Sequence, residues 1–371
     1  MTASILECYV TTHPGVEAIT AAELESHGMV PGDSEPGGVP FTGNFEAVAA
    51  ANLHLRTASR VLVRLGTFRA RTFPELERHA GRLPWLDQLP EGAPVAFAIT
   101  TRKSKLYHQG AIAERLLRVM GGGSRPVLAA DDDSAQLFVV RVVRDEFTIS
   151  ADSSGALLHR RGYRLATGKA PLRETLAAAM LLALGWDGTL PLLDPFCGSG
   201  TIPIEAALIA RRIPPGHARR FAFERWPGAD LAALERIRTR ALERVLPRVA
   251  TAILGSDRDA GAIESAGANA VRAGVAEAIE FRRAPLSAVE PTGTPGLLLT
   301  NPPYGVRVGE RRPLRDLYAQ LGNVARQRLP GWEIALLSAH AELAAQVRLS
   351  FRTIFETSNG GLPIRLVAGK A

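Results

Sequence analysis

Three short segments of the sequence combine polar side chains with glycine or proline in patterns that can bind a ligand and act on it. In the first, LLDPFCGSGT at 192–201, an apolar run ends at Asp194, and Gly198 and Gly200 precede a helical pattern. Glycines let the backbone approach a ligand closely, and a helix N-terminus offers unpaired N–H groups. The GxxxxGK[ST] spacing of a phosphate loop is missing from it. One acid beside two glycines suits a zwitterionic amino acid, with N–H groups for its carboxylate and Asp194 for its amine.

The second segment is ILGSDRD at 253–259, where another apolar run ends at Asp257. In a doubly wound sheet, an acid at the end of the next strand can hydrogen-bond both hydroxyls of a ribose. Taken alone, such an acid is more often a helix cap or part of a turn. Its place downstream of the glycine segment favours the ribose interpretation.

The third segment is LLLTNPPYG at 297–305, an apolar run that ends in Asn301, Pro302, Pro303 and Tyr304. The two prolines fix a rigid carbonyl beside an amide and an aromatic ring. The Asn301 side-chain oxygen and the Pro302 carbonyl can accept the two N–H bonds of an exocyclic amine, while Tyr304 stacks on the base. The alternative is that two prolines before an aromatic residue simply close a strand.

The elements that must position these segments follow a βαβ pattern from residue 173 onward. Short apolar runs predict strands, with helices between them, such as the one predicted over Thr201–Arg211. This alternation predicts an open, mostly parallel, doubly wound sheet. The predicted strands are Leu190–Leu193, Ile253–Ser256, Ile279–Arg282 and Gly296–Thr300.

The first 165 residues have a different organisation. A strand over Leu6–Thr11, a helix over Gly15–Ser26 and a helix over Glu46–Arg56 predict a small α+β module of ferredoxin-like type. Strands and helices then alternate at short intervals up to residue 165. A linker is expected at Leu165–Leu172, which contains Gly168 and Pro171.

Composition limits the class of protein. The 371 residues are 46% hydrophobic and 22% charged, which is the ordinary balance of a globular protein. No apolar run approaches the roughly 20 residues that span a bilayer. The N-terminus has no signal-peptide pattern, and the two cysteines suit a reducing compartment. We expect a cytoplasmic protein with no membrane association.

The charge is unevenly distributed. The net charge is +7, yet residues 1–55 contain no lysine or arginine and seven acids, whereas residues 56–173 carry 20 basic and 11 acidic residues. A basic middle segment suggests a surface that faces a polyanion, most plausibly nucleic acid. The alternative is solvated charge in an arginine-favouring chain, because only four of the 44 basic residues are lysines.

Together the three segments resemble the class I methyltransferases that use S-adenosylmethionine (SAM) and act on amino groups. Further stretches are similar to the THUMP-domain RNA guanine-N2 methyltransferases, most of all the RlmL type that acts on 23S rRNA, with the TrmN type that acts on tRNA as a sibling. The resemblance covers most of the chain. These stretches are LHRRGYRLATGKAPLRETLAAAMLLAL at 158–184, ITTRKSKLYHQGAIAERL at 99–116, FERWPG at 223–228 and SNGGLPIRL at 358–366.

The resemblance implies an α/β fold: a ferredoxin-like module over 1–56, a THUMP RNA-binding domain over 57–165 and a Rossmann-like class I methyltransferase domain over 166–371. It implies SAM-dependent methylation of a guanosine N2 amine in RNA, 23S rRNA or tRNA. We expect no DNA partner, and a two-part chain of this size can act as a monomer. The eight histidines show no metal-ligand spacing, so no metal is expected. The catalytic residues implied are Asn301, Pro302, Pro303 and Tyr304. The SAM-binding residues implied are Asp194, Phe196, Cys197, Gly198, Gly200, Asp257 and Arg258.

Two basic clusters are expected to contact RNA phosphates: Arg102, Lys103 and Lys105 beside Tyr107, and Arg160, Arg161 and Arg164 near the linker. One departure from the family pattern concerns adenine recognition. Members often carry an acid after the third strand, whereas this chain has Ala284 near that position and its next acid is Glu290.

Three alternatives remain open from the sequence. The NPPY motif also occurs in DNA adenine-N6 methyltransferases and in enzymes that methylate a glutamine side chain. A non-catalytic RNA-binding protein with a vestigial domain is the third. The N-terminal half argues against the first two, and the intact motifs argue against the last. Cys197 lies in the glycine segment and is expected to be a small packed residue rather than a nucleophile.

Overall fold

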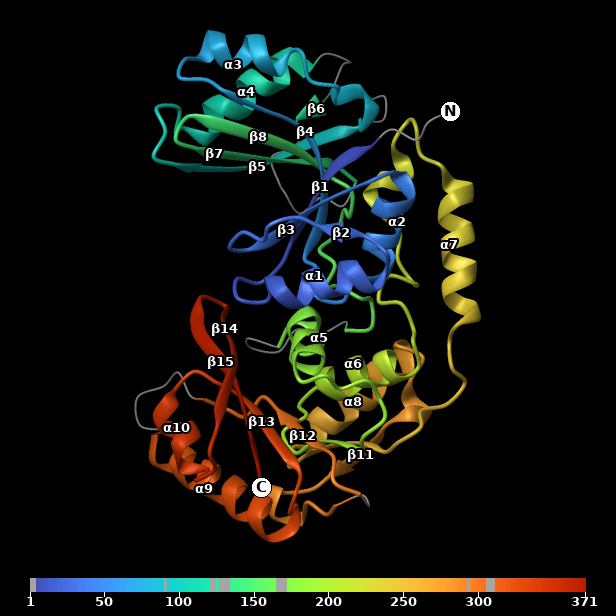
Figure 1. The fold of residues 1–371 in the computed structure, drawn as a ribbon, viewed down its shortest axis with the longest axis vertical. Helices are drawn as coiled ribbons and strands as arrows, with labels where there is room; N and C mark the ends of the chain where they lie inside the picture. The colour runs from blue at the N-terminus through green and yellow to red at the C-terminus, as the bar shows by residue number, and fades with distance from the viewer. Residues whose placement is uncertain are drawn as a thin grey trace. The chain divides into compact units, whose positions relative to one another are not determined.

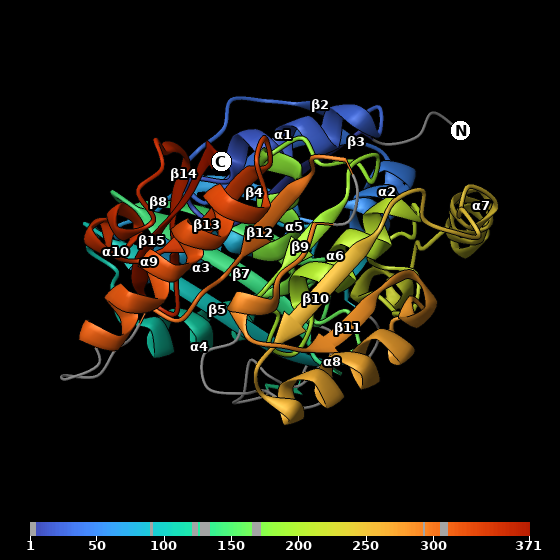
Figure 2. The same ribbon diagram turned by 90° about the horizontal axis from the view of Figure 1, so that it is seen from below.

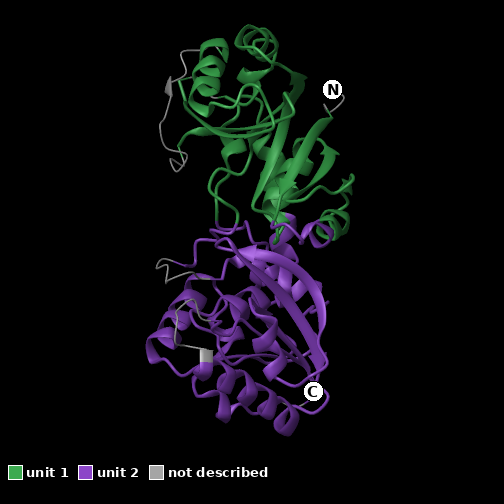
Figure 3. Ribbon diagram, turned by 90° about the vertical axis from the view of Figure 1, so that its left-hand side faces the viewer, with its two compact units in different colours: residues 1–12, 21–158, 219–239 green, residues 13–20, 159–218, 240–371 purple. Residues whose placement is uncertain are grey.

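The computed structural model describes residues 5–89, 92–120, 125–126, 134–164, 172–291, 294–304 and 311–371. The chain divides into two compact units (Figure 3). Unit 1 comprises residues 1–12, 21–158 and 219–239, and unit 2 comprises residues 13–20, 159–218 and 240–371. Most of the linker expected at Leu165–Leu172 lies outside the described residues.

Unit 1 is built on an eight-stranded sheet with the order β2-β3-β1-β4-β8-β7-β5-β6 (Figure 1). Its pairs are antiparallel, except that β5 runs parallel to both β7 and β6. The strands are β1 (Leu6–Thr11), β2 (Val30–Pro31), β3 (Gly38–Gly43), β4 (Arg60–Arg69), β5 (Pro94–Arg102), β6 (Arg125–Pro126), β7 (Gln136–Val143) and β8 (Glu146–Asp152).

Helices supply the other half of the unit 1 core. They are α1 (Glu17–Ser26), which has residues in both units, α2 (Phe45–His54), α3 (Phe73–Ala80) and α4 (Gln109–Met120), with short 3-10 turns η1 (Trp85–Asp87) and η2 (Ala222–Arg225). Buried Val48, Leu76 and Ile112 from three of these helices pack against Val10 and Phe138 of the sheet. The buried residues of α4 thus belong to the same core as the sheet.

One segment packs in a unit that the sequence does not assign it to. Residues 219–239 fall within the predicted methyltransferase domain, yet they belong to unit 1. The reason is their apolar content, because Phe221, Phe223, Trp226 and Leu234 are buried in the unit 1 core. Helix α7 (Leu231–Glu243) begins in this segment and ends in unit 2.

Unit 2 is built on a seven-stranded sheet with the order β11-β10-β9-β12-β13-β15-β14. The first five strands are parallel, and β15 is antiparallel to both neighbours. The strands are β9 (Leu192–Asp194), β10 (Ile253–Asp257), β11 (Glu280–Arg283), β12 (Leu297–Thr300), β13 (Glu333–Ser338), β14 (Arg352–Asn359) and β15 (Leu362–Lys370).

Helices cover both faces of this sheet (Figure 2). On one face, Leu192 and Leu299 pack with apolar residues of α5, α6 and α8, and on the other, Leu193 and Leu298 pack with those of α9 and α10. Burial on both faces explains why the central strands read as continuous apolar runs. The helices are α5 (Glu174–Ala183), α6 (Thr201–Ala210), α8 (Ala260–Arg272), α9 (Arg311–Arg328) and α10 (Ala341–Gln346), with short turns η3 (Ala276–Ala278) and η4 (Leu286–Ala288).

The order of the strands fixes where a ligand can bind. The chain runs outward from β9 through β10 to β11 and then returns to place β12 on the other side of β9. Ligands of open α/β sheets bind at such a switch point, beyond the carboxyl ends of the strands. The predicted α/β fold, with a doubly wound sheet after an α+β N-terminal part, is confirmed. In the described part of the chain, no helix is long and apolar enough to cross a membrane.

Candidate functional site

The three predicted segments meet at the carboxyl edge of the unit 2 sheet. Asp194 ends β9, Asp257 ends the neighbouring β10, and Asn301 follows β12 on the opposite side of β9. The parallel register places Asp194 opposite Gly255, and Leu193 opposite Leu298. Adjacent parallel strands therefore deliver two acids and one amide to the switch point.

The glycine segment forms a tight loop between β9 and α6. Gly198 and Gly200 have positive φ angles of 49° and 83°, a conformation that favours glycine. The N–H of Cys197 donates to the Ser256 carbonyl over 3.0 Å, which ties the loop to the end of β10. A Cβ added at Gly198 would meet no atom of the described residues within 4 Å, so among these residues the loop has open space on that side.

Asp257 reaches back to this loop. Its Oδ2 accepts a hydrogen bond from the Gly198 N–H over 3.1 Å, and its Oδ1 accepts one from the Asp259 N–H over 3.0 Å. The side chain of Asp259 instead caps α8 by accepting from the Gly261 N–H over 2.8 Å. The carboxylate of Asp257 thus lies against the glycine loop, whereas the carboxylate of Asp259 caps α8.

Asp194 is a buried acid at the centre of the site. It is 2% exposed, and its Oδ1 accepts hydrogen bonds from Thr300 Oγ1 over 2.6 Å and from the Phe196 N–H over 3.2 Å. Burial raises the pKa of Asp194 to about 7, and the negative charge of Asp257 adds to the rise. A nearby cation would lower that pKa again, because it favours the ionised form.

The Asn-Pro-Pro-Tyr segment begins directly after the buried strand β12. Asn301 is half-buried, and among the described residues its Oδ1 is a buried acceptor without a hydrogen-bond partner. Pro302 is buried, Pro303 is exposed, and Tyr304 is half-buried against the apolar cluster under α9. A buried acceptor without a donor costs a protein about 1–3 kcal/mol.

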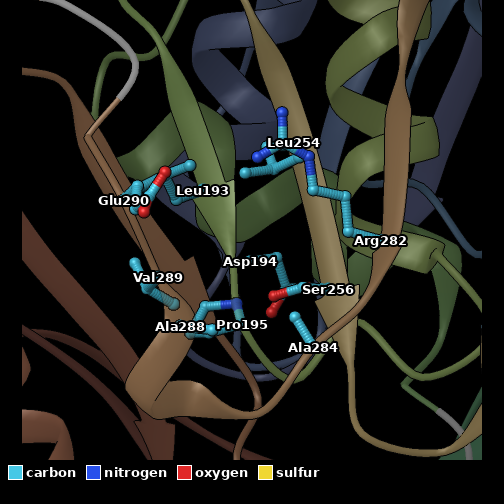
Figure 4. A pocket seen from close by; sticks show the side chains of 10 residues that line it. All are labelled: Leu193, Asp194, Pro195, Leu254, Ser256, Arg282, Ala284, Ala288, Val289 and Glu290. Carbon is cyan, nitrogen blue, oxygen red and sulfur yellow. The ribbon is translucent and has the colours of Figure 1, made fainter.

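A small pocket lies beside Asp194, at the carboxyl ends of β9, β10 and β11 (Figure 4). Ala284, near the position where family members often carry an acid, lies in the wall of this pocket. Glu290 and Arg282 lie on opposite sides of the pocket. The residues that line it are Leu193, Asp194, Pro195, Leu254, Ser256, Arg282, Ala284, Ala288, Val289 and Glu290.

The other predicted residues of the glycine segment differ in exposure. Cys197 is 7% exposed, and burial raises the pKa of its thiol well above the ordinary value, with the charge of Asp194 adding to the rise. A thiol held neutral is a poor nucleophile. Phe196 is half-buried against the cluster under α9, and Arg258 is exposed beyond Asp257.

The first basic cluster lies in unit 1, at the end of β5 and in the loop that follows it. Arg102, Lys103 and Lys105 are exposed, and Tyr107 beside them is 73% exposed. Lys103 has a φ of 51°, a strained conformation for a side chain with a Cβ. The loop is held by Asp145, whose Oδ1 accepts from the Lys105 N–H over 2.7 Å.

Asp145 also binds a further basic residue, Arg71, next to this loop. Its Oδ2 accepts from Arg71 Nε over 3.0 Å, and the hydrogen bond from the Lys105 N–H lowers the pKa of the Asp145 carboxyl. Arg144, the other residue of the turn between β7 and β8, donates its N–H to the Arg102 carbonyl over 3.1 Å. Hydrogen bonds of Arg144 and Asp145 thus tie the turn between β7 and β8 to the basic cluster.

The second basic cluster lies in unit 2, and two of its members are buried. The side chain of Arg161 is 3% exposed, with Nε 3.5 Å from Glu205 Oε1. That of Arg164 is 7% exposed, with Nε 3.5 Å from Glu174 Oε1. Both therefore act inside the unit, against the expectation that they face phosphate, whereas Arg160 is exposed.

Comparison with known proteins places the chain. A family model described as the RMKL-like methyltransferase domain matches residues 161–367, and one described as the RlmL ferredoxin-like domain matches residues 7–62. The crystal structure of SMU.472 complexed with SAH, at 30% sequence identity, covers 100% of this chain and 99% of its own, with a TM-score of 0.89.

Two curated relatives differ in length. "Putative RNA methyltransferase slr0064" of Synechocystis sp. is 32% identical over 97% of this chain and 95% of its own. "Ribosomal RNA large subunit methyltransferase K/L" of Methylococcus capsulatus is 35% identical over 96% of this chain, which spans 50% of that relative. The chain belongs to the family with an RMKL-like methyltransferase domain, preceded by an RlmL ferredoxin-like domain.

Proposed function

We propose that this chain transfers a methyl group from SAM to the exocyclic N2 amine of a guanosine in RNA, with 23S rRNA as the first candidate and tRNA as the second. The observation that carries the proposal is the buried Oδ1 of Asn301, which has no hydrogen-bond partner among the described residues and directly follows β12, the strand next to β9 with its Asp194. The names of the relatives support RNA as the substrate class.

The residues at the switch point fit SAM as the methyl donor. Open space beside Gly198 leaves room for a ligand against the backbone, and the first turn of α6 presents N–H groups to a carboxylate. Asp194 is a buried acid that needs a cation to stay ionised at neutral pH, which the ammonium of an amino acid supplies. Asp257 is placed for the ribose hydroxyls. When bound, SAM supplies an electrophilic methyl group.

The part played by Asn301 and Pro302 is orientation. The lone pair of a guanine N2 amine is delocalised into the ring, which makes it a weak nucleophile. Asn301 Oδ1 and the Pro302 carbonyl accept hydrogen bonds from the two N–H groups of the amine, so that its lone pair turns toward the methyl group. Such positioning is sensitive, since a misplacement of about 1 Å can reduce the rate roughly 100-fold.

No general base is needed for this reaction. The amine loses its proton after methyl transfer, when the nitrogen has become acidic, and solvent can take that proton. Tyr304 provides the surface on which the base stacks once it leaves its helix, because chemistry on a base requires it to be unpaired or flipped out.

The pocket of Figure 4 offers a place for the adenine ring of SAM. It has apolar walls from Leu193, Leu254 and Val289. Ala284 has no side-chain acceptor for the adenine amine, and Glu290, the next acid in the sequence, lines the same pocket. We assign Glu290 as the acceptor for the adenine amine. The sequence holds this signal only as the next acid after Ala284.

RNA contact is proposed for the loop that carries Arg102, Lys103 and Lys105, with Arg71 beside it, and for the exposed Arg160. Phosphate contacts of this kind give affinity that depends on salt, and the base pocket supplies the chemistry. Arg161 and Arg164 are left out of this proposal because their side chains are buried in ion pairs.

The experiment is methyl transfer from labelled SAM to unmodified 23S rRNA and, separately, to unmodified bulk tRNA, followed by nucleoside analysis of both. N2-methylguanosine in rRNA alone supports the first candidate, and the same nucleoside in tRNA alone moves the substrate to the second. N6-methyladenosine in either RNA contradicts the choice of base. Methylation of duplex DNA in place of RNA contradicts the choice of nucleic acid.

A further inference from the structure

The glycine loop is supported from behind by α8, a helix that contributes no residue to the predicted motifs. Gly200 and Ala266 are so close that a Cβ on Gly200 would lie 3.0 Å from the Cβ of Ala266. Between the two glycines lies Ser199, whose carbonyl faces α8 and accepts a hydrogen bond from Asn269 Nδ2 over 2.9 Å. The middle of the loop is therefore anchored by one buried amide.

That amide is itself fixed from its other end. Asn269 is 4% exposed, and its Oδ1 accepts a hydrogen bond from Arg272 Nη2. Arg272 Nε donates in turn to the Tyr163 carbonyl over 2.7 Å. With its oxygen held by Arg272, the Asn269 amide can present only its NH₂ group to the Ser199 carbonyl. The orientation of the amide follows from its partners.

The far end of this chain of hydrogen bonds is also held firmly. The hydroxyl of Tyr163 donates to Glu205 Oε1 of α6 over 3.1 Å, inside unit 2. The next residue, Arg164, donates from Nη2 to Thr201 Oγ1 at the first residue of α6. Residues 163 and 164 thus form hydrogen bonds to α6, the helix that starts at the glycine loop. Arg272 connects Tyr163 to the loop through Asn269.

From these contacts we infer that Asn269 and Arg272 are positioning residues for SAM: they hold the Ser199 carbonyl back so that the loop keeps the shape that receives the ligand. The inference rests on the proposal that the glycine loop binds SAM. Neither residue is proposed to touch the ligand, because both act on the side of the loop that faces α8. Preorganisation of this kind increases affinity by removing the entropic cost of ordering the loop upon binding.

The diagnostic change is Asn269→Asp, which is nearly isosteric. The carboxylate still accepts from Arg272 but cannot donate to the Ser199 carbonyl, and it faces that carbonyl with like partial charge. If the donated bond shapes the loop, the Kd for SAM rises by about tenfold, in line with one buried hydrogen bond. In the ligand-free protein, amide hydrogen exchange of the peptide that contains residues 196–201 becomes faster by a similar factor.

Two further variants keep the test decisive. Arg272→Gln alters an exposed side chain, so it is expected to fold even where Asn269→Asp does not, and it moves both readouts in the same direction by a smaller factor. Arg211→Gln is the matched control. Arg211 donates from Nη1 to the Gly274 carbonyl over 2.8 Å, just beyond α8, and does not contact the loop. It leaves the Kd for SAM and the exchange of the loop unchanged.

Asp257→Ala distinguishes a failure of the proposed SAM site from a failure of the positioning role of Asn269 and Arg272. If it weakens SAM binding while Asn269→Asp and Arg272→Gln leave both the Kd and the loop exchange as in the wild type, the inference is overturned and the SAM site stands. If Asp257→Ala also binds SAM normally, the proposed SAM site itself is wrong. A fall in thermal stability of Asn269→Asp at unchanged Kd and loop exchange assigns the residue a merely structural role.

Discussion

Thr300 donates a hydrogen bond to Asp194 over 2.6 Å, and the two residues are 106 positions apart in the sequence. Thr300 is the last residue of β12 and directly precedes Asn301, while Asp194 is the last residue of β9 before the glycine loop. A single bond thus joins the strand that presents the amide to the strand that presents the buried acid. This bond links the proposed base site to the proposed SAM site, and such a link suits a reaction that depends on distance.

The raised pKa of Asp194 predicts that SAM binding releases a proton. The carboxyl titrates near pH 7 in the free protein, and an ammonium group placed beside it favours the ionised form. At pH 6 the free acid is therefore mostly protonated, and binding expels that proton. Calorimetric titrations in buffers of different ionisation enthalpy measure the release. Asp194→Asn is expected to show none, so equal release in both proteins contradicts the assignment.

The same pKa predicts how Asp194 affects stability in the absence of ligand. Its folded-state pKa of about 7 lies above the ordinary value of 3.8, so its stabilising contribution is complete below about pH 4 and is lost as pH rises through 7. The wild type should therefore lose stability relative to Asp194→Asn between pH 5 and 8, on the order of 2–4 kcal/mol. Urea unfolding of both proteins at several pH values measures this difference, and a constant difference would refute it.

Asp257 and Asp259 offer a matched pair of carboxylates two residues apart. Asp257→Ala is expected to weaken SAM binding by at least about tenfold, since it removes the ribose acceptor and the bond to the Gly198 N–H. Asp259→Ala removes the cap of α8, which should lower stability by about 1 kcal/mol and leave the Kd for SAM unchanged. Binding and unfolding measurements on both variants separate the two roles. A reversed pattern would place the ribose elsewhere.

Lys103 provides a clean test of the RNA surface. Lys103→Gly removes the charge and relieves the left-handed backbone, so the variant should fold at least as stably as the wild type. Its RNA affinity should fall, and the slope of log affinity against log salt should decrease by about 0.7–0.9 for one lost phosphate contact. Filter binding over a range of salt concentrations measures both.

Arg236→Ala is the control for this variant. Arg236 is an exposed arginine of unit 1, and its ion pair with Glu46 is not part of the basic loop. The variant should keep the affinity and salt slope of the wild type. If Lys103→Gly behaves in the same way as this control, Lys103 does not contact RNA.

Much of the site could be predicted from the sequence because its residues stand at strand ends. Asp194, Asp257 and Asn301 each follow an apolar run, and parallel strands bring their carboxyl ends to one edge. The apolar runs also predict the strands, although the bounds differ by a few residues. For example, β9 spans Leu192–Asp194, whereas the predicted strand is Leu190–Leu193.

Residues that act through distant partners could not be found in this way. Arg161 and Arg164 belong to a basic run that favours a surface, and only the fold brings Glu205 and Glu174 to them. Asn269 and Arg272 lie within an ordinary amphipathic helix, and nothing local indicates that Asn269 donates to the Ser199 carbonyl or that Arg272 donates to the Tyr163 carbonyl. The apolar residues of 219–239 show that the segment is buried but not in which unit.

The proposed role of Asn301 is to orient an exocyclic guanine amine for methylation by SAM, and a comparison of two proteins measures that role. Wild type and Asn301→Ala are incubated with SAM carrying a heavy methyl group and with unmodified RNA, and the nucleosides are quantified by mass spectrometry while the Kd for SAM is measured in parallel. We expect heavy N2-methylguanosine with the wild type, a loss of about 100-fold or more with Asn301→Ala, and an unchanged Kd for SAM. An Asn301→Ala protein that retains full methyl transfer would contradict this role of Asn301.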